Sequence, residues 1–152
     1  MKYLLTLAAC IMPAFAQAQM VEAGYPRSVV DAIQDMGYPA TLETDSSGDP
    51  KVASKIDGTN YSIWFYGCDE YGRGCDTMNF SAGFDLKNGV DISVINNWNR
   101  KKLLGRAYVD DEYDPFLDHV VKADGGIPVP TFRGIVNHWE LAIREYKEAI
   151  GW

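Results

Sequence analysis

The chain has 152 residues, and its 21 acidic side chains against 14 basic ones give a formal net charge of −7 at pH 7. This acidic balance argues against nucleic acid and anionic membrane surfaces as partners, because both require a basic surface. The length suits one domain with a buried core, and no repeat or linker divides it.

The first 18 residues have the pattern of a secretory signal peptide. Lys2 precedes an apolar run over residues 4–12, and small residues then offer cleavage sites after Ala16 and Ala18. The run is shorter than the roughly 20 apolar residues that span a bilayer. We therefore predict a periplasmic or secreted protein with no membrane insertion after signal cleavage. The alternative is a lipid-anchored protein, because residues 7–10 resemble a lipoprotein cleavage box that ends at Cys10.

A helix and four strands are predicted next. The helix begins at Pro26 or Ser28 and ends at Met36, since Gly37 is placed to stop it. The strands form an antiparallel meander separated by turn-forming residues, with predicted ranges of 41–45, 52–56, 61–66 and 77–85.

Cys68 and Cys75 flank a turn between the last two of these strands. A hairpin brings its flanking positions to a separation of about 4.5 to 5.5 Å between Cβ atoms, near that of a disulfide. An exported chain also meets an oxidising compartment. A zinc site would need more ligands at a recognisable spacing, and a catalytic dithiol usually has the C-x-x-C spacing. The sequence therefore predicts a structural disulfide, with no metal or cofactor.

The second helix is predicted to begin near Asn88, with Asp91 as its capping-box partner. Its basic end, residues 100–102, is typical of cations that complement a helix dipole. The helix contains a cluster of three amides and an indole: Asn96, Asn97, Trp98 and Asn99. These side chains form either a polar site or a structural motif in which amides satisfy free backbone groups and the indole packs the helix onto the sheet.

Two further strands are predicted at residues 104–110 and 116–122, followed by a helix that begins near Pro130 or Thr131. The acidic turn between the strands lacks the ligand spacing of a calcium loop. The helix has an apolar stripe at three- and four-residue steps: Phe132, Val136, Trp139, Ile143, Tyr146 and Ile150. This stripe predicts an amphipathic helix lying against a sheet. The elements together predict an α+β fold of about six antiparallel strands and three helices.

Five groups of residues in these elements form a recognisable set: residues 48–50, 65–68 with Cys75, 95–99, 105–110, and 125–126 with Phe132 and Trp139. Together they resemble the YbjN domain family of bacteria, over roughly residues 30–150, and we assign residues 25–152 to such a domain. The resemblance implies a fold similar to the type III secretion chaperones, whose relatives bind protein segments and often form dimers. It also implies a role in regulating sensory transduction, and it supplies no catalytic residues.

We find no nucleophile motif, metal-binding motif or phosphate loop in the sequence. His119 falls in a predicted strand and His138 in a predicted helix, so they do not point to one catalytic site. We therefore expect a non-enzymatic interaction module that binds a protein or peptide, with a homodimer as one expected assembly. The alternative is a small-ligand-binding or hydrolytic periplasmic enzyme that uses acidic residues.

Overall fold

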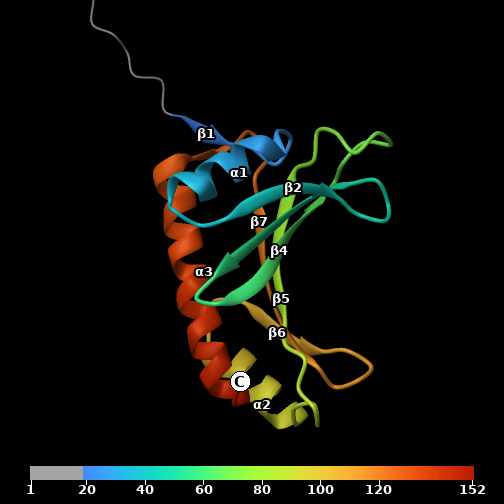
Figure 1. Cartoon of the computed structure of the whole chain (residues 1–152), viewed down its shortest axis with the longest axis vertical. Coiled ribbons are helices and arrows are strands. Elements are labelled where there is room, and N and C mark those ends of the chain that lie inside the picture. Colours follow the sequence, from blue (N-terminus) through green and yellow to red (C-terminus); the bar gives the residue numbers. More distant parts are fainter. Residues whose placement is uncertain (1–18) are drawn as a thin grey trace, which may run out of the picture.

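The computed structural model describes residues 19–152, which form a six-stranded antiparallel sheet with three helices on one side of it (Figure 1). The predicted signal peptide of residues 1–18, with Cys10, lies outside the described residues. The elements are β1 (Met20–Val21), α1 (Pro26–Asp35), β2 (Ala40–Thr44), β3 (Pro50–Ile56), β4 (Thr59–Tyr66), β5 (Thr77–Gly83), α2 (Ile92–Lys101), β6 (Arg106–Val109), β7 (Pro115–Lys122), β8 (Ile127–Pro128) and α3 (Val129–Ile150).

The large sheet has the strand order β2-β3-β4-β5-β7-β6, with every neighbouring pair antiparallel. The predicted α+β class and the order of helix, four strands, helix, two strands and helix are therefore confirmed. β4 and β5 lie mid-sheet, while β2 and β6 form the two edges.

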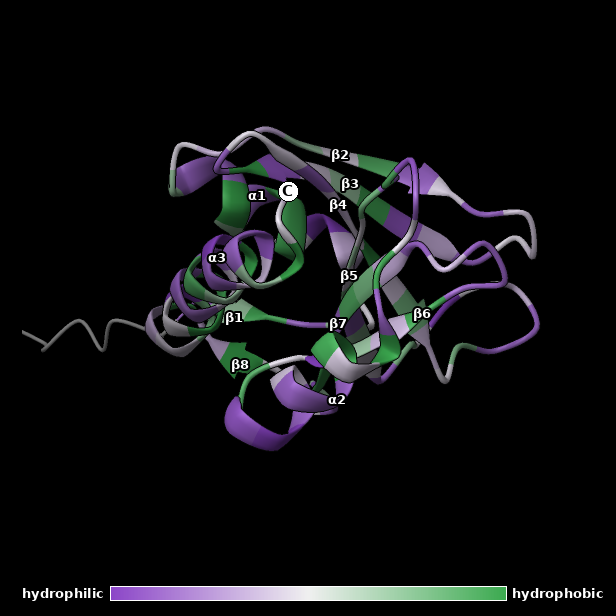
Figure 2. Ribbon diagram, turned by 90° about the horizontal axis from the view of Figure 1, so that it is seen from below, coloured by the Kyte–Doolittle hydropathy of each residue, from purple (hydrophilic) through white to green (hydrophobic). Residues whose placement is uncertain are grey.

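The core lies between α3 and the sheet, where apolar segments face one another (Figure 2). All six residues of the predicted apolar stripe on α3 are buried, which confirms the helical periodicity. The indole of Trp139 lies 5.9 Å from the rings of both Tyr61 and Phe80, measured between centroids. Phe132 packs on the other side of Phe80, so the aromatic side chains join α3 to β4 and β5.

The prediction that α2 begins near Asn88 is wrong, because the helix begins at Ile92. Asp91 is itself the N-cap, and its carboxylate accepts a hydrogen bond of 2.7 Å from the Ser93 N–H. Asn88 instead belongs to a turn in which the Gly89 N–H donates to the Leu86 carbonyl. Gly89 has φ +60°, which a helix does not use.

The other predicted boundaries differ from those of the structure by at most two residues. β6 begins at Arg106 and not at Leu104, because Gly105 adopts φ +78° and a Cβ there would lie 2.7 Å from Leu117 Cδ1. The two-residue strands β1 and β8 were not predicted. They pair Met20 with Pro128 and Val21 with Ile127, and two residues are too few to show an alternating pattern.

Candidate functional site

The side of the sheet opposite the helices is open to solvent, and we call it the open face. Residues paired across strands lie on the same side of a sheet. Two rows of pairs on the open face are Trp64, Asn79 and Val120, and then Ser81, Asp118 and Arg106. Two hollows of about 560 and 420 Å³ lie over this face. The larger hollow is therefore the candidate binding site.

Buried polar groups line the larger hollow, which is unusual on a sheet surface. Asp118 is 6% exposed and Asn79 is 9% exposed, although both lie on the side without helices. The Oδ1 atom of each has no hydrogen-bond partner among residues 19–152. Asp118 Oδ2 accepts a charged hydrogen bond of 3.2 Å from Arg106 Nη2. An unsatisfied buried acceptor costs about 1–3 kcal/mol, so these two oxygens favour binding of a hydrogen-bond donor.

Apolar and aromatic side chains surround this polar centre. Val120 is 65% exposed and Tyr66 is 51% exposed, and both line the larger hollow. The Arg106 guanidinium lies 4.9 Å from the centroid of the Tyr108 ring, which in turn stacks on Phe116 at 5.3 Å. An exposed apolar surface beside fixed polar groups is the usual composition of a binding site.

The predicted cluster at residues 96–99 does not form one polar site. Asn96 and Asn97 are exposed, and Asn97 Oδ1 accepts a hydrogen bond from Arg100. Trp98 is buried and packs edge-on against Tyr146 at 4.9 Å between ring centroids, so it joins α2 to α3. Trp98 and Asn99 thus contact other elements of the fold, whereas Asn96 and Asn97 lie on the exposed side of α2.

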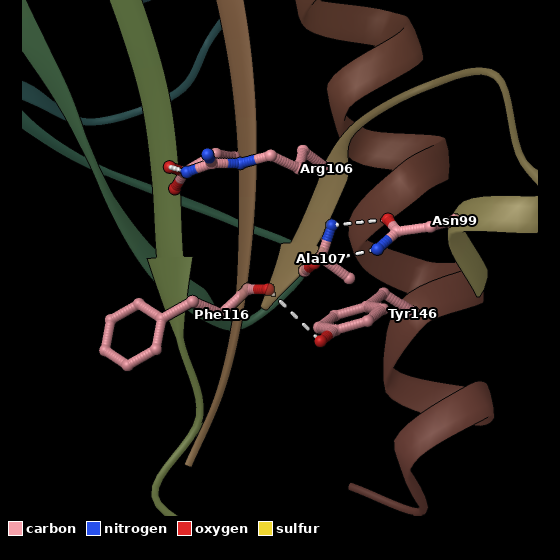
Figure 3. A network of polar contacts seen from close by, with 6 residues as sticks. Asn99, Arg106, Ala107, Phe116 and Tyr146 are labelled. Atoms are coloured by element: carbon pink, nitrogen blue, oxygen red, sulfur yellow. Dashed lines mark hydrogen bonds and ion pairs between the residues drawn. The ribbon is translucent and has the colours of Figure 1, made fainter. Parts of the chain in front are cut away.

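The Asn99 side chain forms hydrogen bonds with the backbone of the edge strand β6 (Figure 3). Its Oδ1 accepts from the Ala107 N–H and its Nδ2 donates to the Ala107 carbonyl, each at 2.9 Å. The side chain thus pairs with the backbone as a neighbouring strand would. The same view shows the Tyr146 hydroxyl, which donates to the Phe116 carbonyl at 3.1 Å. α2 and α3 therefore hold β6 and β7 in place behind the open face.

Replacing Asn99 with alanine should lower the free energy of unfolding by about 1–2 kcal/mol, because two hydrogen bonds to Ala107 are lost. Urea denaturation of the purified variant measures this difference. Asn96→Ala is the matched control, since the Asn96 side chain is exposed on the same helix. Equal stabilities for the two variants would contradict the structural role of Asn99.

A disulfide joins Cys68 and Cys75 in the loop between β4 and β5, with Cα atoms 3.9 Å apart. Beside it, the Asp76 N–H donates to the Tyr66 carbonyl at 3.0 Å and continues the strand pairing. Cys75 is 4% exposed and belongs to the core. No group of three His, Cys, Asp or Glu side chains among the described residues is arranged to hold a metal ion.

Replacing both cysteines with serine should lower the free energy of unfolding by about 2 kcal/mol, because the bond closes a short loop in the unfolded chain. Thermal unfolding with and without a reductant tests the same point on the native chain. A stability that is unchanged by reduction would show that the bond contributes nothing.

His119 lies on the helix side of β7, beside Phe80 and near Leu104 and Trp139. Burial lowers the pKa of its imidazole below the usual 6.5, and the nearby His138 lowers it further. His119 on β7 and His138 on α3 are thus neighbours in the structure, which the sequence alone did not show. The larger hollow includes His119 in its lining.

The lowered pKa of His119 predicts a loss of stability in mild acid. The unfolded chain takes up a proton first, so this contribution is present above the unfolded pKa of 6.5 and is lost as pH falls through the lower folded pKa. We expect the wild type to lose more unfolding free energy than His119→Gln between about pH 7 and pH 5. Parallel pH profiles for the two proteins would contradict this assignment.

Sequence patterns missed the centre of the candidate site. Asn79 occupies a polar position in the alternating strand β5, and Asp118 is a polar residue within β7, and such positions also describe solvent-exposed residues. Their proximity depends on the pairing of β5 with β7, and the salt bridge depends on the pairing of β6 with β7. A polar residue at mid-strand was the only signal available.

Within residues 19–152, no helix has the length and hydropathy needed to cross a membrane. Residues 26–152 match the family model YbjN, which is described as "Putative bacterial sensory transduction regulator". A comparison with curated proteins found no match. Because the family model covers most of the chain, the chain belongs to the YbjN family, which is not a known enzyme family.

Proposed function

We propose that this YbjN-family chain is an exported, non-enzymatic interaction module that holds a segment of a partner protein or peptide against the open face. The family description supports a regulatory role, in which partner binding is the event that is sensed. The observation that carries the proposal is the exposure of Tyr66 and Val120 beside the unpartnered oxygens of Asn79 and Asp118.

An extended segment fits the chemistry of this surface. Its backbone N–H groups are the donors that the buried oxygens of Asn79 and Asp118 require. Its apolar side chains would cover Tyr66 and Val120. The Arg106 side chain is 72% exposed, so it is free to shift and open access to Asp118.

Photo-crosslinking tests the binding surface. A benzophenone amino acid at Tyr66 should yield a discrete adduct with a periplasmic protein or peptide in living cells. The matched control is the same group at Tyr113, which is 57% exposed in the loop before β7 and lines neither of the two hollows. No adduct from Tyr66, or the same adduct from both positions, would count against the proposal.

Small-ligand binding is the second candidate function, supported by the 560 Å³ volume of the larger hollow. Hydrolysis by acidic residues has less support, because Asp118 is the only carboxylate among residues 19–152 that lines this hollow, and it is paired with Arg106. Acid–base hydrolysis of the glycosidase type uses two carboxylates about 5 to 9.5 Å apart. A low-molecular-mass compound that copurifies with the protein and is lost in Arg106→Ala would favour the second candidate.

Export is tested by the mass of the N-terminal peptide of the native protein. Cleavage after Ala16 or Ala18 gives a chain that begins at Gln17 or Gln19. A lipid-modified Cys10 at the N-terminus would favour the anchored alternative. An intact Met1 terminus on cytosolic protein would contradict export.

A further inference from the structure

Strand β7 extends beyond its neighbour β6 at one end of the large sheet. β6 pairs only with residues 115–118 of β7, whereas β5 pairs with residues 116–122. The chain leaves the side of β7 just before β6, where Gly105 adopts φ +78°. Residues 119–122 therefore have a neighbouring strand on one side only, and we call this free stretch of β7 the notch.

Two residues of the notch have backbone groups without partners. In an antiparallel ladder, successive residues direct their N–H and C=O groups to opposite sides. The Phe84 N–H donates to the Pro115 carbonyl at 3.0 Å, and the Ala123 N–H donates to the β5 side at 2.8 Å, so the odd-numbered residues of β7 face β5. Val120 and Lys122 therefore face the notch, and no backbone or side-chain group among residues 19–152 pairs with their N–H and C=O.

The notch opens into the larger hollow of the open face. Gly105, Val120 and the fully exposed Leu103 all line that hollow. The single charged residue of stretch 119–122 is Lys122, and Asp76 neutralises it in a salt bridge. The charge that usually protects a free edge is thus weak here, and a free edge is a template for pairing with another chain.

We propose that a segment of the partner protein enters the notch as an added strand, pairing its backbone with Val120 and Lys122; this inference rests on the proposed function. On the open face, the partner residue opposite Val120 is apolar, because Val120 and Leu103 are exposed apolar side chains there. The partner residue opposite Lys122 is acidic, because the Lys122 and Arg106 side chains are 57% and 72% exposed and lie on either side of Val120.

An extended backbone is the ligand that matches the free groups of the notch. Val120 and Lys122 repeat the same pair of N–H and C=O groups at a spacing of about 6.8 Å, which is two residues of a strand. A compact small molecule cannot meet both pairs at that spacing. In strand addition, the backbone bonds supply affinity and the alternate side chains supply selectivity. The notch is short, so the segment gains further contacts where it continues onto the open face.

Amide hydrogen exchange of the purified chain tests whether the edge is free. The Val120 and Lys122 amides should exchange at least a hundredfold faster than the Val121 amide, which faces β5. Equal protection of the three amides would overturn the proposal, because the edge would then already be covered.

Photo-crosslinking beside the notch tests the pairing. A benzophenone amino acid at Leu103 should capture the same partner in living cells as the one at Tyr66. Val120→Pro should lower the yield of the Leu103 adduct at least tenfold, because proline removes an N–H that faces the notch and leaves the ladder with β5 intact. Val120→Thr keeps that N–H and should lose much less. Equal yields from the two variants would overturn the pairing.

Exchange in the crosslinked protein gives a second readout without a substitution in the notch, which also decides the matter if the unfolding curve shows that Val120→Pro is not folded. In the purified Tyr66 adduct, the Val120 and Lys122 amides should exchange at least tenfold more slowly than in the free chain. No added protection would overturn the notch and leave the proposed function intact. No Tyr66 adduct at all would overturn both, and an adduct with the mass of two copies of this chain would overturn a foreign segment.

The acidic residue of the partner is tested at Lys122. Lys122→Glu should lower the yield of the Leu103 adduct at least threefold more than Lys122→Gln, because both variants remove the cation and only glutamate places a like charge opposite the acidic residue. Unfolding curves recorded in parallel exclude a loss of folded protein. Equal yields from the two variants would overturn the acidic residue.

Discussion

Trp139→Ala should lower the free energy of unfolding by about 3–5 kcal/mol, which is a large share of the stability of a domain of this size. Trp139 is 1% exposed and lies midway along α3. Its ring contacts Tyr61 on β4 and Phe80 on β5, so its removal leaves a cavity between the helix and the middle of the sheet. Urea denaturation measures the loss.

Two variants of α3 separate this cavity effect from a general sensitivity of the helix. Trp139→Phe should cost much less than alanine, because it keeps most of the ring volume and removes an indole N–H that has no partner among residues 19–152. Leu141→Ala lies on the exposed side of the helix and should change stability by less than about 1 kcal/mol. A loss of unfolding free energy in Leu141→Ala as large as that in Trp139→Ala would contradict a central role of Trp139 in the core.

Val120→Glu should reduce the yield of the Tyr66 adduct at least tenfold without unfolding the protein. Val120 is 65% exposed at the larger hollow, so the charge is tolerated in the free protein. When a partner covers the hollow, the same charge is taken out of water, and that desolvation is costly. The measurement is the crosslinking yield at equal protein level, with unfolding curves recorded in parallel.

Val120→Thr is the matched control, because it keeps the β-branched shape and adds no charge. It should retain most of the adduct. Full crosslinking in the Val120→Glu variant would show that Val120 is not part of the binding surface. A loss of crosslinking that accompanies unfolding would be explained by stability alone, which the parallel curves detect.

Local sequence patterns predicted most of the architecture, because helices, strands and turns each depend on residues that lie close together in the sequence. The stripe on α3 repeats over about five turns, so its buried side was evident. The turns at residues 46–50 and 57–58 separate the strands of a meander, and the structure pairs β2 with β3 and β3 with β4. The start of α2 was misplaced because Asn88 and Asp91 both have N-cap chemistry, and only the conformation of Gly89 distinguishes them.

The candidate site was less accessible to prediction because it depends on contacts between distant segments. Asp118 reaches Arg106 across β6 and β7, and Asn79 comes near Asp118 only because β7 inserts between β5 and β6. The sequence instead drew attention to Asn96, Asn97, Trp98 and Asn99, whose residue types are conspicuous. Of these, Asn99 satisfies backbone groups, as one of the two interpretations held, but its partner Ala107 lies on another element and no local pattern identified it.

Hydroxyl-radical footprinting in intact cells tests the central claim, that a partner covers the open face, most directly. Tyr66 and Tyr113 are 51% and 57% exposed in the free chain and should react to similar extents in the purified protein. In cells, the account predicts that Tyr66 becomes protected while Tyr113 stays reactive. Equal reactivity of Tyr66 in cells and in the purified protein would contradict it.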